Sequence, residues 1–391
     1  MSTQALLTLP GRRSSARAAL TASPVALALS AFVAVRLVAL GTLVALAGRR
    51  GESGYRVLVK WDAQWYRGIA ENGYGFTRLH EDGRLLSDYA FFPLFPFVER
   101  WVGRATGLVP VDAGLLVSLV CSVAAAWGIY AVAAHVYSPR VGVTATVLWA
   151  ALPVGVVQWM AYSESLFTAL AAWSLHAVLT RRWLLAGALA CCAGLTRPTG
   201  VAVVAAVVVA AAVEHRSRAR GPSSGAPNGL GRVAATLLAP LGALGYLVWV
   251  GLRVGDPTGY FDVTGGWNNG LDGGVAFAAW TGELLGGPAP LSGLLVLAGV
   301  VALVGVLCLT VRQRQPLPLL VFCAVLVTLA LTTSGYFGSK PRYLLPAFPL
   351  LLPLARWMAS RHLWLSSTLL AVLAVVSAVY GAGWLLGPGP P

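Results

Sequence analysis

Long apolar stretches, separated by short connections that contain arginine, constrain this chain more than any other feature. A transmembrane helix needs about 20 consecutive apolar residues. The chain has 57% hydrophobic and 11% charged residues, whereas soluble domains contain about 25% charged residues. We therefore expect an all-α polytopic membrane protein. Its eleven spans are expected near residues 25–47, 113–136, 141–158, 165–180, 183–196, 199–213, 233–252, 291–311, 317–333, 343–356 and 363–386.

The charges predict the orientation of these spans. Connections on the cytoplasmic side carry an excess of Lys and Arg, which places the N-terminus in the cytoplasm and the C-terminus outside. The segments then assigned to the cytoplasm hold half of all Lys and Arg residues but a single acid, Glu214. Because acidic residues contribute little to orientation, their gathering on the outer side predicts an active site there. The Ala, Gly and Arg bias is compatible with a GC-rich bacterial gene, and so with a bacterial plasma membrane.

The run 183–213 is interrupted by Leu195-Thr196-Arg197-Pro198-Thr199-Gly200. A single kinked helix would reverse the charge rule for the following spans. Pro198 breaks a helix and disfavours helical conformation at the preceding residue, so we expect two short antiparallel spans with Arg197 at the outer face. The first would be only about 21 Å long. Arg36, midway along the first span, is expected to pair with an acid inside the bundle.

These assignments predict one transmembrane domain, residues 25–386, between a basic cytoplasmic tail at 1–24 and a short C-terminal tail at 387–391. Its first outer loop is residues 48–112, and its second is residues 253–290. Residues 214–232 are rich in Gly, Pro and Ser and predict a flexible cytoplasmic linker.

The first outer loop contains the best candidate for a catalytic residue. Asp62 lies among Trp61, Trp65 and Tyr66, about fifteen residues beyond the first span. Tryptophan and tyrosine favour the membrane interface, and a partly desolvated carboxylate there is suited to act as a general base. The structural alternative is that Asp62 begins a helix as its N-cap.

Other groups on the predicted outer face suit a lipid-linked substrate. Phe91-Phe92-Pro93 form either an interfacial turn or the wall of a groove for a lipid phosphate. Ser163 and Glu164, at the outer end of the fourth span, either cap a helix or shape the site. Arg197, Lys340 and Arg342 suit phosphate oxygens, and their alternative role is to pair with outer carboxylates.

Familiar cofactor motifs are missing from the sequence. It contains no HExxH motif, Walker loop or dinucleotide fingerprint. We therefore expect no cofactor and no metal ligands, and the sequence makes no prediction about a divalent cation. Without a nucleotide-sugar site, the donor is expected to be embedded in the membrane. Nucleic acid is not an expected partner, because the basic residues follow the membrane charge rule.

The motifs WDAQWYRGIAENGY and AFFPLFP, followed by YSESLF, LTRPTG and SKPRY, resemble the PIG-V family of mannosyltransferases over roughly residues 25–350. The resemblance implies a GT-C type bundle with an acidic catalytic residue in its first outer loop. It also implies a polyprenyl-phosphate-mannose donor and inversion at the anomeric carbon. Asp62 matches the catalytic acid of the motif. Trp65 stands where eukaryotic members carry His, so their acceptor recognition is not carried over.

We therefore expect a membrane mannosyltransferase that acts on a lipid or glycan acceptor, with Asp62 as general base. An alternative is a transporter or flippase of a lipid-linked saccharide, which should place polar residues at mid-bilayer depth in several spans. Only Arg36 is clearly there. A third reading is a structural subunit, for which replacing Asp62 would be harmless. The expected donor- and acceptor-binding residues are Trp61, Gln64, Trp65, Tyr66, Asp88, Phe91, Phe92, Pro93, Ser163, Glu164, Arg197, Lys340, Arg342 and Tyr343.

Overall fold

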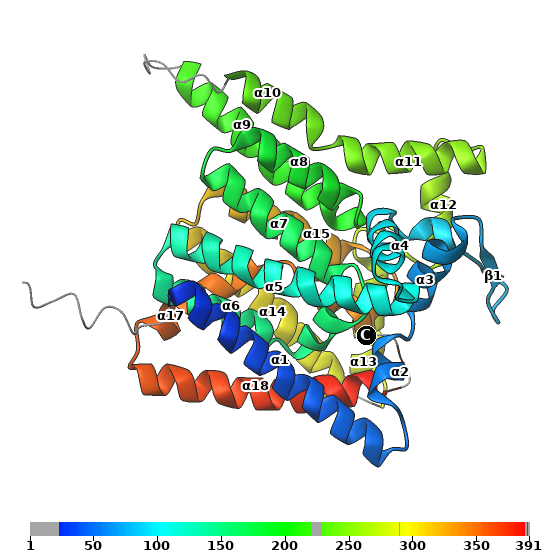
Figure 1. The fold of residues 1–391 in the computed structure, drawn as a ribbon, viewed down its shortest axis with the longest axis horizontal. Helices are drawn as coiled ribbons and strands as arrows, with labels where there is room; N and C mark the ends of the chain where they lie inside the picture. Colours follow the sequence, from blue (N-terminus) through cyan, green and yellow to red (C-terminus); the bar gives the residue numbers. More distant parts are fainter. Residues whose placement is uncertain (1–22, 220–228, 289, 388, 390–391) are drawn as a thin grey trace, which may run out of the picture.

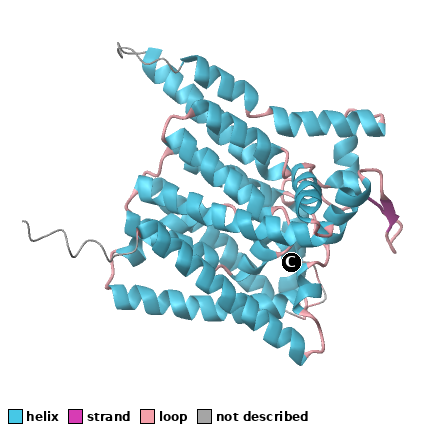
Figure 2. Cartoon of the chain, in the orientation of Figure 1, coloured by secondary structure: helices cyan, strands magenta, loops and turns pink. Residues whose placement is uncertain are grey.

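The chain forms a bundle of roughly parallel helices with a small cap of short elements at one end (Figures 1 and 2). The computed structural model describes residues 23–219, 229–288, 290–387 and 389. Nearly all of the expected tail 1–24, the middle of the linker 214–232 and most of the tail 387–391 lie outside the described residues.

Each of the eleven expected spans overlaps a helix or a broken helix. Six helices of the described chain are long and apolar enough to cross a membrane, or seven if one bent pair is a single span. The expectation of a polytopic helical membrane protein is confirmed, and eleven crossings remain a prediction. The elements are α1 (Pro24–Arg49), α5 (Pro110–Val136), α6 (Pro139–Ala150) with the 3-10 helix η2 (Pro153–Trp159), α7 (Glu164–Leu179), α8 (Trp183–Gly194), α9 (Val201–Ala219), α10 (Gly229–Leu238) with α11 (Leu241–Val254), α14 (Pro290–Arg312), α15 (Leu317–Thr332), η5 (Phe348–Leu351) with α17 (Leu352–Ala359), and α18 (Leu363–Leu385).

The third expected span is broken rather than continuous. α6 and η2 meet at an angle of 84°, with Pro153 at the start of η2, where no helical hydrogen bond is lost. The buried Arg36 of α1 donates to the carbonyl of Ala150 at 3.1 Å, at the end of α6, and lies over the Trp159 ring. A cation at a helix C-terminus is stabilised by the helix dipole. The expected acidic partner of Arg36 is therefore wrong, since the break supplies a carbonyl instead.

The interrupted run 183–213 forms two antiparallel helices, as expected. α8 and α9 are joined at the short 3-10 helix η3 (Pro198–Gly200). Arg197 precedes it in an extended conformation, as the following proline favours. A Cβ atom at Gly200 would lie 2.6 Å from the Cα of Gly194, so the turn requires glycine. The prediction of two short segments is confirmed.

The cap at the right-hand end of Figure 1 is built mainly from the two expected outer loops. The first contributes a hairpin in which Thr77, Arg78 and Leu79 pair with Ser87, Leu86 and Leu85. The expected loops are therefore largely structured. The cap elements are α2 (Gly54–Leu58), α3 (Asp62–Asn72), β1 (Thr77–Leu79), β2 (Leu85–Ser87), η1 (Asp88–Ala90), α4 (Leu94–Thr106), α12 (Gly259–Gly266), α13 (Val275–Gly286), η4 (Phe337–Ser339) and α16 (Lys340–Tyr343).

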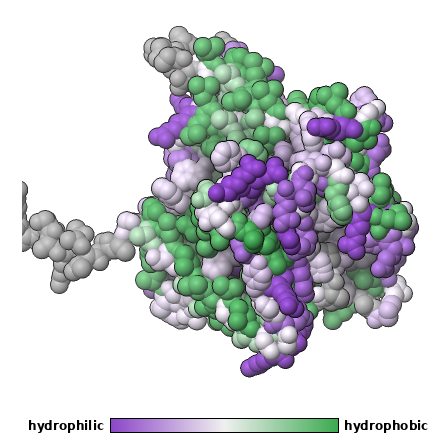
Figure 3. Space-filling view, turned by 45° about the vertical axis from the view of Figure 1, so that its right-hand side comes forward, coloured by the Kyte–Doolittle hydropathy of each residue, from purple (hydrophilic) through white to green (hydrophobic). Residues whose placement is uncertain are grey.

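The surface differs between this end and the sides of the bundle. Figure 3 turns the cap forward and shows hydrophilic side chains gathered in a band between hydrophobic surfaces. α14, by contrast, has a mean hydropathy of 2.9 and only 6% of its most apolar window is buried inside the protein. Such a helix is suited to contact lipid. The polar groups that could carry chemistry therefore collect at one end of the bundle.

Candidate active site

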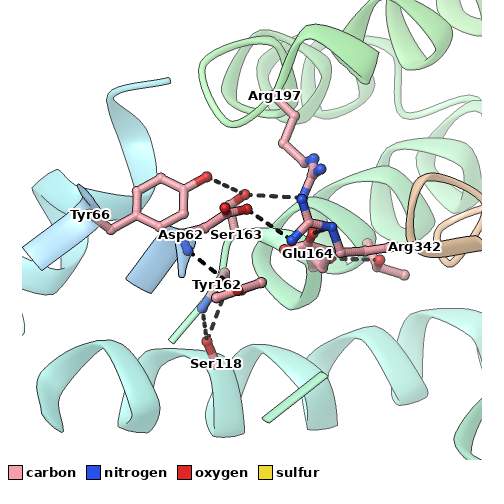
Figure 4. A network of polar contacts seen from close by, with 9 residues as sticks. Asp62, Tyr66, Ser118, Tyr162, Ser163, Glu164, Arg197 and Arg342 are labelled. Carbon is pink, nitrogen blue, oxygen red and sulfur yellow. Dashed lines mark hydrogen bonds and ion pairs between the residues drawn. The ribbon is translucent and has the colours of Figure 1, made fainter. Parts of the chain in front are cut away.

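Asp62 is the first residue of α3, and its carboxylate points into the junction between the cap and the bundle (Figure 4). Its Oδ2 atom lies 2.8 Å from Nη1 of Arg342, which the short helix α16 presents from the far end of the sequence. The Asp62 side chain is 24% exposed, whereas that of Arg342 is 8% exposed. Among the described residues, none forms a hydrogen bond with Oδ1 of Asp62. This oxygen remains available to a substrate.

Glu164 connects two arginines behind Asp62. It begins α7 and is 1% exposed; its Oε1 atom lies 3.1 Å from Nε of Arg342 and forms an ion pair with Nη1 of Arg197. Asp62, Glu164, Arg197 and Arg342 thus form an alternating cluster of two carboxylates and two guanidinium groups. We call it the charge cluster. The ion pairing that the sequence left as an alternative for these cations is present, and the loss of one partner would leave a buried unpaired charge.

Three further polar or aromatic residues surround the charge cluster. The hydroxyl of Tyr66 lies 2.8 Å from the Ser163 Oγ atom, which also accepts a hydrogen bond of 3.3 Å from Arg197. Burial raises the pKa of the Tyr66 phenol, so the hydroxyl stays protonated. The Tyr343 ring lies 5.9 Å from the guanidinium of Arg197 and 6.0 Å from that of Arg342. These predicted residues therefore meet around one centre.

Tyr162 is a buried residue of this centre that sequence reasoning did not select. Its hydroxyl accepts a hydrogen bond from the backbone N–H of Asp62 and donates one to the carbonyl of Lys60, each 3.3 Å long. Its ring lies 5.2 Å from the guanidinium of Arg342. Ser118, from α5, binds the backbone of Tyr162. The position of Tyr162 next to Ser163 and Glu164 could have indicated its place in the site. Ser118 could not have been found in this way, because it is a lone serine in an apolar span.

The remaining aromatic residues of the first loop form a cluster beside the centre. Trp65 stacks on Phe91 with ring centroids 5.6 Å apart, and Trp267 of the second outer loop meets both rings edge-on. Phe92 packs against Tyr246 and Tyr260. These contacts join the two outer loops. Phe91 and Phe92 are buried, while Trp65 is half-buried.

Three predicted residues make backbone contacts. Asp88 is buried, and its carboxylate accepts hydrogen bonds from the N–H groups of Gly75 and Phe76, which fixes the hairpin. Pro93 precedes α4 as its N-cap residue. Gln64 donates from its side-chain amide to the carbonyl of Val59. All three shape the first outer loop, and the structure brings none of them into contact with the charge cluster.

Lys340 lies on a different side of α16 from Arg342. Its ammonium group binds the carbonyl and hydroxyl oxygens of Thr333 and lies over the rings of Phe277 and Phe337. It lines a cavity of about 880 Å³ among η2, α13, α14, α15, α17 and α18. Of the described residues that line this cavity, Lys340 alone is charged. One short helix therefore connects an apolar cavity with the charge cluster.

No group of three His, Cys, Asp or Glu side chains placed to hold a metal ion occurs in the described part of the chain.

Burial lowers the pKa of Lys340, while a nearby carboxylate, Asp272, opposes this shift.

Comparison with known proteins supports the fold. The model of a family described as dolichyl-phosphate-mannose-protein mannosyltransferase matches residues 93–250. No curated protein matches the sequence.

Two solved structures superpose on most of the chain. One is archaeal oligosaccharyltransferase AglB from Archaeoglobus fulgidus, in complex with an inhibitory peptide and a dolichol-phosphate. It has a TM-score of 0.50 and 12% sequence identity, and the superposition covers 93% of this chain and 56% of the AglB chain. ArnT from Cupriavidus metallidurans, bound to undecaprenyl phosphate, has a TM-score of 0.53 and 17% identity, covering 87% of this chain and 61% of its own. The chain thus spans a little over half the length of these proteins. The expected GT-C type fold is confirmed.

Proposed function

We propose that this protein is a membrane glycosyltransferase that moves mannose from polyprenyl-phosphate-mannose to a hydroxyl of a lipid or glycan acceptor. The reaction would take place at the outer membrane face. The observation that carries the proposal is Asp62, a partly exposed carboxylate with one oxygen paired with Arg342 and the other without a hydrogen bond to the described residues. A general base needs this arrangement of fixed orientation and access.

In the proposed reaction, the acceptor hydroxyl attacks C1 of the sugar on the face opposite the phosphate. The bond from C1 to the phosphate oxygen breaks, and its electron pair leaves with polyprenyl phosphate. Oδ1 of Asp62 takes the proton of the hydroxyl, as the base does in inverting sugar chemistry. The products are an inverted mannoside and polyprenyl phosphate.

The apolar cavity beside Lys340 suits the donor lipid. Its lining consists almost entirely of apolar side chains, and the ammonium group of Lys340 is the charge that a phosphate at its rim would meet. Each buried methylene of such a chain contributes about 0.8 kcal/mol. The two solved relatives contain dolichol-phosphate and undecaprenyl phosphate, respectively. Because α16 presents Lys340 to the cavity and Arg342 to the charge cluster, a phosphate at the rim of the cavity would have its sugar near Asp62.

The charge cluster would stabilise the leaving phosphate through Arg342. Guanidinium groups suit phosphate oxygens because they offer paired hydrogen bonds, and fixed donors stabilise developing charge without reorganising. Glu164 would keep Arg342 and Arg197 in place before the donor arrives. The half-buried Trp65, with Trp267, offers an aromatic face to a sugar ring or acceptor.

The test compares Asp62→Asn with the parent, purified in lipid nanodiscs. Radiolabelled polyprenyl-phosphate-mannose is the donor, and a membrane-lipid extract is the acceptor. Asp62→Asn keeps the size of the side chain but removes the base, so transfer should fall by at least about 100-fold. Asp262→Asn is the matched control, because this exposed aspartate of α12 lies outside the charge cluster and should leave transfer unchanged.

Two outcomes contradict parts of this proposal. Equal transfer by the parent and a folded Asp62→Asn variant would remove Asp62 from the mechanism. If the parent transfers nothing but moves the labelled lipid across liposome membranes, the protein is a transporter instead.

A further inference from the structure

The backbone immediately before Asp62 is in an unfavourable conformation. Trp61 has φ = 60° and ψ = −120°, a region that glycine adopts freely and that a Cβ atom disfavours. The indole of Trp61 is half-buried against the apolar cluster that contains Leu43, Met160 and Tyr162. Strained backbone of this kind persists only where surrounding contacts hold it, and it is concentrated at functional sites.

The hydroxyl of Tyr162 spans this strained residue. It accepts from the N–H of Asp62, on one side of Trp61 (Figure 4), and donates to the carbonyl of Lys60, on the other, each at 3.3 Å. Burial raises the pKa of this hydroxyl well above its usual value, so its proton is present at neutral pH for the bond to Lys60. One side chain thus joins both peptide groups that flank Trp61.

Tyr162 is itself held firmly by the bundle. Its residue is 1% exposed, and its N–H and C=O both bond the Ser118 Oγ atom of α5, at 3.4 and 3.1 Å. A backbone hydrogen bond of 3.3 Å, from the N–H of Ala161 to the carbonyl of Leu58, also joins the segment before Tyr162 to the segment before Trp61. Tyr162 is therefore fixed by the bundle, and its hydroxyl can hold the strained backbone at Trp61 in place.

We infer that Tyr162 is a positioning residue that keeps Trp61 in its strained conformation and so directs the Asp62 carboxylate toward Arg342. This inference rests on the proposed function for its kinetic consequence. This role requires no contact between Tyr162 and the substrate, because the Tyr162 hydroxyl already bonds two backbone groups. Its role would be to fix the direction of α3 at its first residue.

A double-mutant cycle between Tyr162→Phe and Trp61→Gly tests the inference. Phenylalanine removes the hydroxyl but keeps the ring that faces Arg342. Glycine adopts the required backbone conformation without strain, so the direction of Asp62 should depend less on the hydroxyl in its presence. The cycle separates the coupling between residues 61 and 162 from the effect of losing the indole, since Trp61→Gly alone serves as the reference. Tyr55→Phe is the matched control, because Tyr55 is exposed and its hydroxyl binds Asp112 instead.

Two quantities are measured in nanodiscs, the melting temperature and the kinetics of transfer. Tyr162→Phe should lower the melting temperature less in the parent background than in the Trp61→Gly background, because only Trp61 can recover strain by relaxing when the hydroxyl is lost. It should lower kcat roughly five- to tenfold, as expected for the loss of one or two hydrogen bonds, with the KM of the donor unchanged. Trp61→Gly/Tyr162→Phe should have nearly the kcat of Trp61→Gly.

Equal effects of Tyr162→Phe in both backgrounds, on both quantities, would overturn the inference. A rise in donor KM with unchanged kcat would show that Tyr162 binds substrate instead of positioning Asp62, and would also overturn it. If the parent itself transfers no mannose, the proposed function fails, and the melting-temperature cycle still decides whether Tyr162 holds the strained turn.

Discussion

At the scale of single residues, the site gathers buried groups whose energetics depend on their partners. Glu164 is buried but lies between two arginines. Glu99, on the inner face of α4, is fully buried, and both of its carboxylate oxygens lack a hydrogen-bond partner among the described residues. It packs so closely on α5 that a Cβ atom at Gly114 would lie 3.0 Å from its Oε1. The two glutamates therefore respond differently to pH.

Glu99 should make stability fall as the pH rises. Burial raises its pKa to about 9, whereas in the unfolded chain it ionises near 4.3. Between these values the folded state holds one more proton than the unfolded state, so rising pH favours unfolding. The melting temperature of the parent should decline between about pH 5 and pH 9, and Glu99→Gln, which stays neutral, should decline less.

The control for this measurement is Glu81→Gln, because Glu81 is exposed in the hairpin turn. It should follow the curve of the parent at every pH. Coinciding curves for Glu99→Gln and the parent would show that the Glu99 carboxyl is not kept neutral by burial.

At the scale of elements, the short helices around the site depend on close backbone contacts. α11 crosses α8 at Gly242, where an added Cβ atom would lie 1.9 Å from the carbonyl oxygen of Cys191. In membranes, small residues allow helices to approach closely. The crossing positions the cap, because Tyr246 of α11 donates to the carbonyls of Tyr89 and Phe91.

Gly242→Ala should therefore destabilise the protein, since the two backbones must move apart. Overpacking costs about 1–3 kcal/mol, which should appear as a lower melting temperature and weaker transfer. Gly245→Ala, on the same helix but with nothing within 4 Å of the added atom, should be neutral or slightly stabilising. Equal melting temperatures for the two variants would contradict the close crossing.

At the scale of the whole molecule, the two ends of the bundle differ in their charged groups. The charge cluster and most acids lie at the end that carries the cap, and Arg50 donates there to the carbonyl of Leu386, just beyond α18. Arg140, Arg356 and Arg361 lie at the opposite end, where Arg140 donates to the Arg361 carbonyl and Arg356 lies over the Tyr137 ring. The orientation of these two ends in the membrane remains a prediction.

The orientation itself predicts an accessibility difference. A cysteine introduced by Glu81→Cys, in the hairpin of the cap, should react with a membrane-impermeant maleimide in intact cells. One introduced by Ser360→Cys, in the exposed connection before α18, should react only after permeabilisation. The parent, with its five native cysteines, sets the background. The reverse pattern of labelling would place the active site in the cytoplasm.

Local patterns along the chain predicted the class of the fold and the neighbourhood of the candidate site. Hydropathy is a local property, so each apolar run could be recognised without its neighbours, and Pro198 marked the turn between α8 and α9. Asp62 and the motif around Glu164 could likewise be recognised from their immediate neighbours in the sequence. Most predicted site residues do lie at one end of the bundle, and their roles in binding remain predictions.

Which groups meet is visible only in the folded chain. The pairing of Asp62 with Arg342 and the two backbone bonds of Tyr162 join segments far apart in the chain. Such contacts depend on how helices pack, which no local pattern records. The carbonyl partner of Arg36 also arose this way, because the break between α6 and η2 exposed it. Local chemistry thus specified which residues could react, and packing specified their partners.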